Sequence, residues 1–593
     1  MFDFKGWSET AMKVALISTF DNGGAGRAAV KLCRALRRTG VDSCLFVKHA
    51  SGGNSLSEEV GNGGFFSALL EDINLRDFIE NIHSGNTMLS LPYGEMPMNL
   101  LQRLRDYDVI HLQWVAQFVS VECLRQLTQL GKPLLWTLHD QHALTGACHY
   151  THGCSGYTAD CSDCPQMVNN RFDTPRKFLE IKRRYMPPEL VLVTPSRWLA
   201  DCARRSAVFR AHRIETVQYP IELDVFQPQD KVAAKARYGI AARQRVILFG
   251  AEHCAEKRKG FRELLAALRN LKEHPALGAW IRGGEVTLLL FGRETEAVRL
   301  LGIPFAEAGY VDGDENLAQL YSAADVLALP SLEDNMPLVM LEAMACGTPV
   351  VGFDTGGMRD CIEEGRTGYK VACGDTLAFA QALAKVLLGV DLSAACRQYA
   401  KTHFDAVTQA KAHRALYEVL LRQVPRTSRT CFSTQGTETE MLPDTFEALL
   451  PYLQKSLKRV EAYGQIQRLR LLFGTQYQEV YFRRLLQSKL PLASYGERRV
   501  AIWGTGDTAR KWLAVLSEMP EALASVRGFF DGRNGRIGGT VFGQFELLDA
   551  SRAETYGLQA IVIASQKFEA EIYREIRHLE RAKIRVLRLF DES

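Results

Sequence analysis

Two acidic residues flank the start of a predicted helix in the segment SLEDNMPLVMLEAMACGTPV. Asp334 precedes Pro337, which suits the first turn of a helix, and Glu342 follows inside that helix. The free backbone N–H groups at the helix start, around Leu338 and Val339, favour a phosphate group. Acids on either side of a phosphate site suit hydroxyl-rich groups flanking a diphosphate. From spacing alone, the alternative is an N-cap and a solvated helix residue.

Parallel α/β sheets are the elements expected to position these acids. Short apolar runs recur, each followed by a glycine-bearing turn and a segment of helical period, which predicts parallel sheets covered on both faces. One set contains KVALIST, DVIHLQWV, PLLWTLHD, ELVLVTPS and RIETVQYP, and a second contains RVILFGAE, VTLLLFG, ADVLALPS and PVVGFDTGG. Because DVLALPS is a predicted buried strand, Asp334 lies at its carboxyl end, where doubly wound sheets bind ligands.

The order of these segments predicts two doubly wound, Rossmann-like α/β domains that face a cleft, followed by a third, smaller one. The predicted boundaries are an N-terminal tail at 1–11, a first domain at 12–222, a second at 223–400, a helix crossing back at 401–424, a polar linker and helical segment at 425–495, and a small Rossmann-like domain at 496–593.

The composition is that of a soluble globular protein. Of the 593 residues, 47% are hydrophobic and 24% are charged, and the net charge of +4 does not suggest a nucleic-acid partner. The N-terminus does not read as a signal peptide, and no apolar run has the length of a membrane span. Fourteen scattered cysteines suit reduced thiols in a cytoplasm. The basic segments RALRRTG and RKFLEIKRRY are either peripheral contacts to an anionic membrane or solvated helix faces.

The opening segment resembles the E-x7-E signature of family 4 glycosyltransferases, the retaining group 1 enzymes of GT-B fold. The resemblance covers roughly residues 12–424 and rests on motifs in the family's order. These are GGAGRAAVKLCRAL, DVIHLQW, TLHD, RKGFRELLAAL, YVDGDENLAQLYSAADVLALPS and TGGMRDCIEEGRTGYKV. It implies a cytoplasmic hexosyltransferase that moves a sugar from a UDP- or GDP-linked donor to a cell-surface polysaccharide or lipid-linked glycan.

Two departures from the family pattern keep other functions open. The first signature position is Asp334 rather than Glu, preceded by Glu333, and Ala251 stands where the family often has Arg. The alternatives are a GT-B enzyme that hydrolyses or epimerises a nucleotide sugar, and a catalytically silent scaffold that binds one.

The resemblance also assigns roles to individual residues. Asp334 would contact the transferred sugar, with Glu333 as the alternative, and Glu342 would lie by the ribose. Lys259 would hold the diphosphate, and either Arg258 or Lys257 would add a second positive charge. The donor-site candidates further include Gly23, Gly24, Leu338, Val339, Gly356 and Gly357.

His139 of TLHD matches the family histidine that faces the donor sugar, although a structural, hydrogen-bonded histidine is the alternative. Because fixed cations and helix N–H groups can stabilise a diphosphate leaving group, no cofactor is expected to be required for catalysis. The DGD at 312–314 could be read as a metal-binding D-x-D, but a turn that caps the following helix is favoured.

A cysteine-rich loop, GACHYTHGCSGYTADCSDCPQ, predicts a structural zinc site. Its ligands would be Cys148, Cys154, Cys161 and Cys164, which end in C-x2-C. Similar loops occur in a polysaccharide-assembling subset of the family, of the colanic-acid type. Labile disulfides or plain thiols are the alternatives.

The C-terminal segment carries GTGDTA after a predicted strand, a short Rossmann-type fingerprint. Gly504 and Gly506 would form its nucleotide loop, and Asp531 ends the next strand. No Tyr-x-x-x-Lys pair accompanies it. We therefore expect a ligand-sensing, docking or oligomerising module, giving a homo-oligomer or a complex, rather than a second enzyme.

Overall fold

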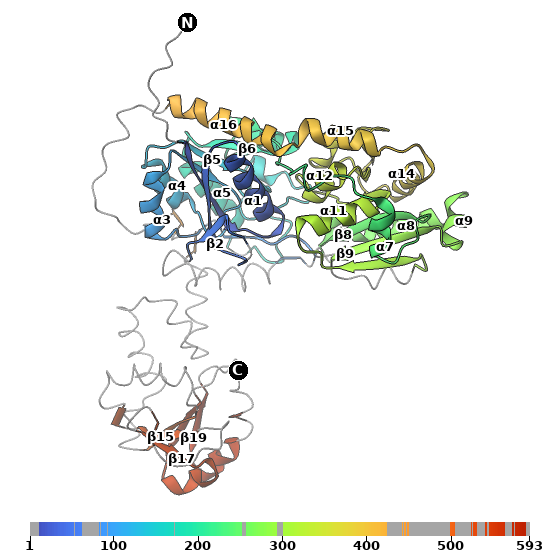
Figure 1. The fold of residues 1–593 in the computed structure, drawn as a ribbon. Coiled ribbons are helices and arrows are strands. Elements are labelled where there is room, and N and C mark those ends of the chain that lie inside the picture. The colour runs from blue at the N-terminus through green and yellow to red at the C-terminus, as the bar shows by residue number, and fades with distance from the viewer. Residues whose placement is uncertain are drawn as a thin grey trace. The chain divides into compact units, whose positions relative to one another are not determined.

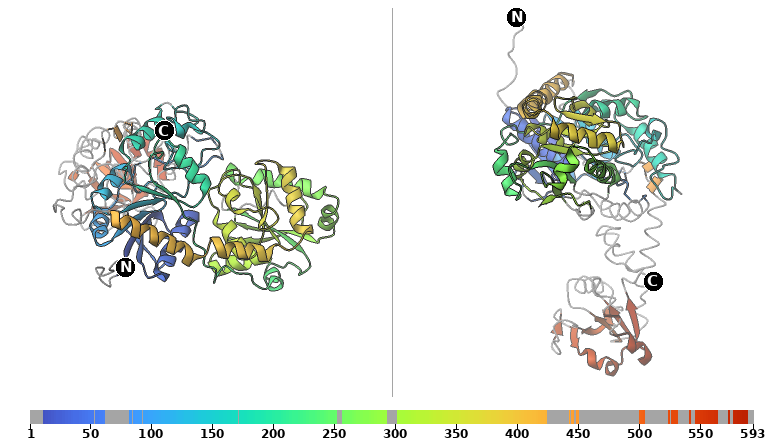
Figure 2. Two further views of the ribbon diagram at one scale, coloured as in Figure 1. Left: turned by 90° about the horizontal axis from the view of Figure 1, so that it is seen from above. Right: turned by 90° about the vertical axis from the view of Figure 1, so that its right-hand side faces the viewer.

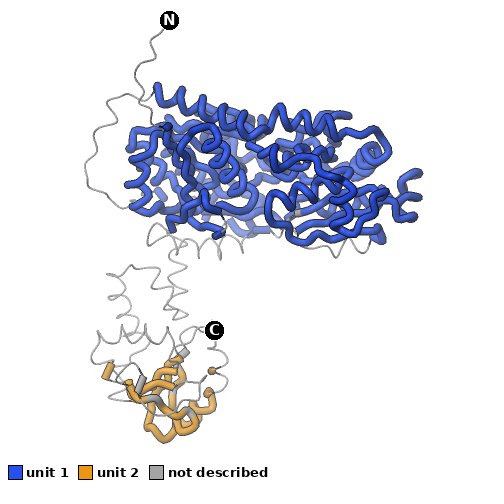
Figure 3. The backbone as a smooth tube through the Cα atoms, viewed as in Figure 1, with its two compact units in different colours: residues 1–64, 74–448 blue, residues 65–73, 449–593 orange. Residues whose placement is uncertain are grey.

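The computed structural model describes most of the first 423 residues and parts of the C-terminal region. The described residues are 11–52, 54–61, 82–83, 85–91, 93–170, 172–251, 256–292, 301–423, 442, 444–445, 448–449, 499–503, 523–524, 526–530, 540–541, 545–563, 572–573 and 576–588. The chain divides into two compact units, residues 1–64 with 74–448 and residues 65–73 with 449–593 (Figure 3).

The first unit contains two parallel sheets, and the first has seven strands. Their order is β3 (Ser57–Glu59), β2 (Asp42–His49), β1 (Lys13–Phe20), β4 (Val109–Leu112), β5 (Leu134–Thr137), β6 (Val191–Thr194) and β7 (Ile214–Thr216). The surrounding helices are α1 (Gly23–Arg38), α3 (Met98–Arg103), α4 (Val121–Thr128), α5 (Thr174–Tyr185) and α6 (Arg197–Arg205), with 3-10 turns η2 (Leu104–Asp106) and η3 (Gly156–Thr158). All six interior residues of β1 are buried, because helices cover both faces of the sheet.

The second sheet has six parallel strands. Their order is β10 (Phe305–Gly309), β9 (Val286–Gly292), β8 (Arg245–Ala251), β11 (Val326–Leu329), β12 (Val350–Phe353) and β13 (Gly368–Val371). Its helices are α7 (Lys231–Arg237), α8 (Phe261–Lys272), α9 (Leu277–Arg282), α11 (Asp314–Ala323), α12 (Leu338–Ala345), α13 (Met358–Cys361), α14 (Thr376–Leu388) and α15 (Ser393–His403), with the 3-10 turn η4 (Lys257–Lys259). We call the first sheet with its helices the N-terminal lobe and the second sheet with its helices the C-terminal lobe. Figure 2 shows them as two distinct lobes.

Two chain segments pass side by side between the lobes. Ile221 N donates to Phe404 O (2.8 Å), and Ala406 N donates to Ile221 O (3.1 Å). Beyond this crossing, α16 (Ala406–Gln423) packs into the N-terminal lobe (Figure 1), where Tyr417 OH lies 2.7 Å from His111 Nδ1. The chain therefore returns to the N-terminal lobe through α16.

The second unit contains a third sheet, whose strands are parallel except for β16. Its order is β16 (Thr540–Val541), β17 (Phe545–Leu548), β15 (Val526–Phe530), β14 (Val500–Trp503), β18 (Ala560–Ile563) and β19 (Arg585–Arg588), with 3-10 segments η7 (Ala550–Tyr556) and η8 (Arg577–Ala582). Setting the short β16 aside, all three sheets place their strands in the doubly wound order 3-2-1-4-5. The predicted fold class is confirmed. Gly504, Gly506 and Asp531 lie outside the described residues.

Among the described helices, none is by itself long and apolar enough to cross a bilayer. The pair α14 and α15, bent by 106°, passes that test by length and composition. Both helices contribute buried residues to the cores of the C-terminal lobe.

Candidate active site

The loop that joins β11 to α12 carries Asp334 at the carboxyl edge of the second sheet. The side chain is buried, and its Oδ2 accepts from Lys259 Nζ (2.8 Å) and from an Arg258 nitrogen (3.2 Å). Burial alone would raise the pKa of Asp334, but the two cations hold that pKa below its usual range. Asp334 is therefore a carboxylate that two positive charges neutralise.

Arg258 and Lys259 are placed by the turn that begins α8. The backbone turns through Gly260 at φ +69°, and a Cβ there would lie 1.8 Å from Pro330 O. Only glycine therefore lets this turn pack against the end of β11. The Arg258 guanidinium also lies 4.2 Å from the Tyr150 ring centroid and donates to Glu256 (2.7 Å).

Gly356 and Gly357 support the Asp334 loop from the next strand end. A Cβ on either residue would lie 1.7 Å from the carbonyl oxygen of Asp334 or of Asn335, respectively. Gly357 N donates to Asp334 O (3.1 Å). In this structure the two glycines therefore hold the backbone of the acidic loop, whereas the sequence predicted that they contact a donor.

The same loop is bonded to the N-terminal lobe. Asn335 Nδ2 donates to His139 O (3.1 Å), and Asn335 Oδ1 accepts from Ser196 Oγ (2.6 Å). The Glu333 carboxylate accepts from Thr151 Oγ1 (3.1 Å) and from His152 N (2.8 Å). Glu333 thus joins the cysteine-rich loop, while Asp334 faces the two cations.

His139 follows β5 and is buried beside the acidic loop. Its Nδ1 lies 2.7 Å from Tyr219 OH, and its Nε2 lies 3.1 Å from Gln113 Oε1. Burial lowers the pKa of His139 to about 4, so the ring is neutral at pH 7. Both ring nitrogens are therefore bonded within the protein, and the backbone oxygen of His139 accepts from Asn335; the position of the ring beside a donor sugar stays a prediction.

Glu342 belongs to a second cluster. Its side chain is fully buried among the apolar residues of α12, and it accepts from Arg27 of α1 (2.8 Å) and from Tyr321 OH (2.9 Å). Lys31 Nζ lies 3.7 Å away. The predicted ribose-binding acid is therefore held, in this structure, by a cation from the other lobe.

The DGD segment lies in the same cluster. Asp314 is the first residue of α11, and it accepts from Arg27 (3.1 Å) and from Lys31 (2.9 Å). The favoured turn is present, because Gly313 at φ +87° precedes the helix. Beyond that turn, Asp314 binds α1 across the lobes.

The remaining candidates lie at two helix starts. Gly23 begins α1 at φ +64°, and a Cβ on Gly23 or Gly24 would meet no atom within 4 Å, so the space above this loop is open. Leu338 and Val339 are the first residues of α12, and Gly347 at φ +80° follows the end of that helix.

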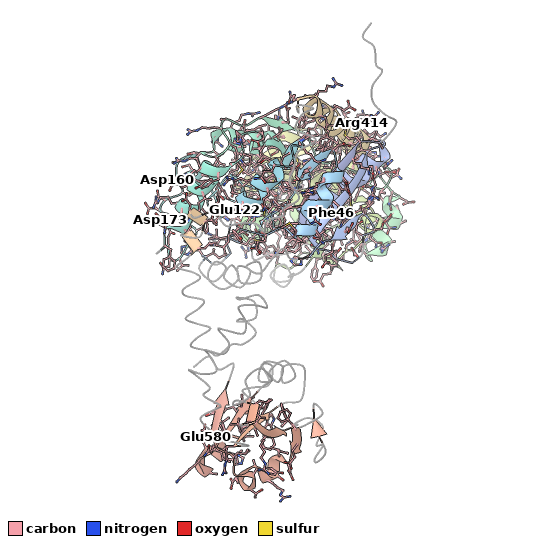
Figure 4. The ribbon with its side chains drawn as sticks, turned by 90° about the vertical axis from the view of Figure 1, so that its left-hand side faces the viewer. Phe46, Glu122, Asp160, Asp173, Arg414 and Glu580 are labelled. Atoms are coloured by element: carbon pink, nitrogen blue, oxygen red, sulfur yellow. The ribbon has the colours of Figure 1, made fainter. Side chains whose placement is uncertain are left out.

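The four cysteines lie on the described part of the loop between β5 and α5. The same loop carries Asp160, an exposed residue that is labelled in Figure 4. All four are free thiols, and burial raises the pKa of Cys161 to about 11. Within the described ranges, no three His, Cys, Asp or Glu side chains are grouped to hold a metal ion. The cysteines as placed here do not form a ligand set, and zinc binding stays a prediction.

Three residues of this site were not predicted from the sequence: Arg27, Tyr150 and Asn335. Arg27 is part of the GGAGR segment quoted above, and a charged residue beside two glycines could have indicated a functional residue. Asn335 follows Asp334 directly, but nothing in the sequence indicates that its side chain bonds the other lobe.

Two family models match the two lobes separately. One, described as "Glycosyltransferase Family 4", matches residues 22–225, and the other, described as "Glycosyl transferases group 1", matches residues 244–388.

Curated relatives include D-inositol 3-phosphate glycosyltransferases of two bacteria. That of Corynebacterium jeikeium is 35% identical over 221 residues, which is 35% of this chain and 52% of the relative. That of Geodermatophilus obscurus is 34% identical over 236 residues, which is 37% of this chain and 52% of the relative. The chain spans about half the length of the curated relatives it matches.

Among solved structures, sucrose-phosphate synthase from Thermosynechococcus elongatus aligns with a TM-score of 0.50 and 20% identity. The alignment covers 70% of this chain and all of that one. This similarity supports the two-lobed fold.

Proposed function

We propose that this chain is a retaining glycosyltransferase of GT-B fold, because its residues 22–225 and 244–388 match the models of family 4 and group 1 glycosyltransferases. The donor would be a nucleotide-diphosphate sugar, UDP- or GDP-linked, and the acceptor a cell-surface polysaccharide or a lipid-linked glycan. The observation that carries the proposal is the pairing of Asp334 with Lys259 and Arg258 at the start of α12.

The two cations suit a diphosphate leaving group. When the bond between sugar and phosphate breaks, negative charge grows on the diphosphate, and preorganised positive charge lowers that barrier. Lys259 and Arg258 would pass from Asp334 to the diphosphate as the donor binds, assisted by the backbone N–H groups of Leu338 and Val339. Asp334 would then be free to bind hydroxyl groups of the transferred sugar.

Glu342 would bind the ribose hydroxyls. It lies eight residues beyond Asp334, and its present partner Arg27 is 32% exposed and reaches it from α1. Donor binding at this position would therefore replace the bond from Arg27. Burial lowers the pKa of His139 to about 4, which makes the ring a weak base, so the departing phosphate is the better candidate to take the acceptor proton.

The wider proposals rest on the sequence. Fourteen scattered cysteines support a cytoplasmic location, and the basic segment of α5 supports peripheral contact with the inner face of a membrane. The spacing of Cys148, Cys154, Cys161 and Cys164 supports a structural zinc ion. Metal analysis of protein purified without chelator should give about one zinc per chain, and a value below one per several chains would exclude that ion.

A screen of nucleotide sugars tests the proposed function. We expect one UDP- or GDP-linked sugar to raise the melting temperature and to be hydrolysed slowly when no acceptor is present. Lys259→Ala should keep the fold and lose the hydrolysis. Stabilisation without any donor turnover would favour a silent nucleotide-sugar-binding scaffold, and no effect from any nucleotide would refute the proposal.

A further inference from the structure

An open cavity of about 610 Å³ lies between α6 of the N-terminal lobe and α13 of the C-terminal lobe. Pockets that bind small molecules usually measure about 300 to 1,000 Å³, so this volume suits a saccharide. We call it the arginine cavity, because its lining residues include Arg197, Arg204, Arg205 and Arg359. Both lobes therefore contribute cations to one space of ligand size.

The lining of the arginine cavity carries a net positive charge. Its other charged residues are Asp201 and Asp360, so four positive charges and two negative charges leave +2. Arg204 pairs with Asp201 (2.8 Å) inside α6, and Arg197 Nε pairs with Asp360 (3.2 Å) across the lobes. The two pairs hold arginine side chains in place and leave an excess of positive charge, which favours an anionic ligand.

The four guanidinium groups keep donors for such a ligand. Arg197 and Arg204 each use one guanidinium nitrogen in the pairs above. Arg205 uses two on acceptors within α6, and Arg359 uses two on Asp354, which lies outside the lining. Each side chain therefore has at least one nitrogen without a partner among the described residues. A guanidinium group matches the oxygens of a phosphate or a carboxylate, which it can bind with two parallel hydrogen bonds.

Trp198 adds an aromatic surface to the lining of the arginine cavity. The ring is half-buried and packs against the core of the N-terminal lobe. Within the described ranges, no other ring and no cation stacks on it, and its Nε1 has no hydrogen-bond partner. The electronegative ring face can pack against the C–H groups of a sugar, and the indole N–H can donate to a hydroxyl group. Such a surface beside arginines suits a saccharide that carries an anionic group.

The arginine cavity adjoins the candidate active site. Arg197 follows Ser196, whose Oγ donates to Asn335 of the acidic loop (2.6 Å). Arg359 lies two residues after Gly357, whose backbone N donates to the same loop (3.1 Å). A saccharide in the cavity would therefore lie beside the loop whose acid is proposed to bind the transferred sugar. Transfer requires this arrangement, because the acceptor hydroxyl must lie next to that sugar.

We propose that the arginine cavity binds the acceptor, and that the acceptor is an anionic saccharide, a sugar that carries a phosphate or a carboxylate. The inference rests on the proposed glycosyltransferase function and specifies its acceptor. Arginines from both lobes would bind the anionic group, and Trp198 would pack against the sugar ring. An uncharged sugar would lack the first contact and a free phosphate would lack the second, so neither should bind as tightly.

The test is isothermal titration calorimetry on the full-length protein with UDP or GDP present, so that the proposed diphosphate site is filled. The probes are the 6-phosphates and the uronates of glucose and galactose, the two neutral sugars, and inorganic phosphate. We expect at least one anionic sugar to bind roughly tenfold more tightly than its neutral sugar and than inorganic phosphate. Its affinity should fall as the salt concentration rises. Whether the 6-phosphate or the uronate binds more tightly identifies the anionic group.

Two variants locate the bound sugar. Arg204→Gln should weaken the binding of that anionic sugar roughly fivefold, the upper range for a partly exposed ion pair. Trp198→Leu should weaken it and leave the affinity for inorganic phosphate unchanged, because only the contact with the sugar ring is lost. Arg210→Gln is the matched control: it removes the same charge from an exposed residue outside the lining and should change neither affinity.

Four results would each overturn the inference. They are no binding of any anionic sugar, neutral sugars that bind as tightly, inorganic phosphate that binds as tightly, and an equal affinity in Arg204→Gln and Arg210→Gln. Nucleotide binding is measured by thermal shift on the same samples. Its absence counts against the glycosyltransferase function itself, whereas its presence in those four cases leaves that function standing.

Discussion

Replacing Lys259 with alanine tests where the leaving-group charge is stabilised. Lys259 Nζ lies 2.8 Å from Asp334 Oδ2 and the side chain is 29% exposed, so it is held in the site and still reaches solvent. Arg258 stays 3.2 Å from the same carboxylate, so Asp334 keeps one cation and the fold should be preserved. Loss of one preorganised charge contact at a leaving group typically costs about 3 kcal/mol, or about 150-fold in rate. Because the diphosphate charge grows as the bond breaks, we expect this loss in kcat.

The assay is steady-state donor turnover, with nucleotide affinity measured separately by thermal shift. Lys257→Ala is the matched control, because Lys257 is exposed and lies two residues earlier in the same 3-10 turn, whereas Arg258, the other candidate for the second positive charge, is the one that contacts Asp334. Glu342→Gln provides the contrast: it should lose mainly donor affinity, since ribose contacts are similar before and at the transition state. A Lys259→Ala enzyme with kcat within twofold of wild type, or an equal loss in Lys257→Ala, would refute the assignment.

Three further outcomes follow from the structure. Asp334→Ala should impair transfer more than Glu333→Ala does, measured as kcat/KM, because Asp334 faces the cations whereas Glu333 bonds Thr151 and His152; the reverse ranking would give the signature role to Glu333. A truncation after residue 448, the end of the main part of the first unit, should still bind nucleotide by thermal shift, and a folded truncate without binding would show that the C-terminal unit completes the site. Burial lowers the pKa of His413 from 6.5 to about 4, so the folded state binds fewer protons. Its contribution to stability is therefore full above pH 6.5 and is lost as the pH falls toward 4, about 2 kcal/mol by pH 5. Urea unfolding should show a smaller decrease between pH 7 and pH 5 in His413→Gln, and an unchanged decrease would contradict the shift.

The sheets and the Asp334 loop could be predicted because local sequence determines them. Alternating strands and helices indicate doubly wound sheets, and parallel strands bring Asp334 and the Lys259 turn to one edge. Contacts between distant segments could not be predicted in this way. Arg27 reaches Glu342 across 315 positions, and the lining of the arginine cavity comes from both lobes. Hydrophobic periodicity reports which face of an element is buried, but not which side chain it meets there.

One face of α1 carries four basic residues at helical spacing, and each is bonded to an acid. Arg27, Lys31, Arg34 and Arg38 pair with Glu342, Asp314, Glu222 and Asp224. We call this row of ion pairs the latch. Its innermost carboxylate, Glu342, is the one proposed to bind a ribose. Ligand and latch would then compete for a single group, so the measured donor affinity would equal the intrinsic affinity multiplied by the fraction of molecules whose latch is open. Salt screens exposed pairs such as Arg38–Asp224 more than the buried Lys31–Glu222, so under the proposed function ionic strength would change the open fraction mainly through the exposed pairs.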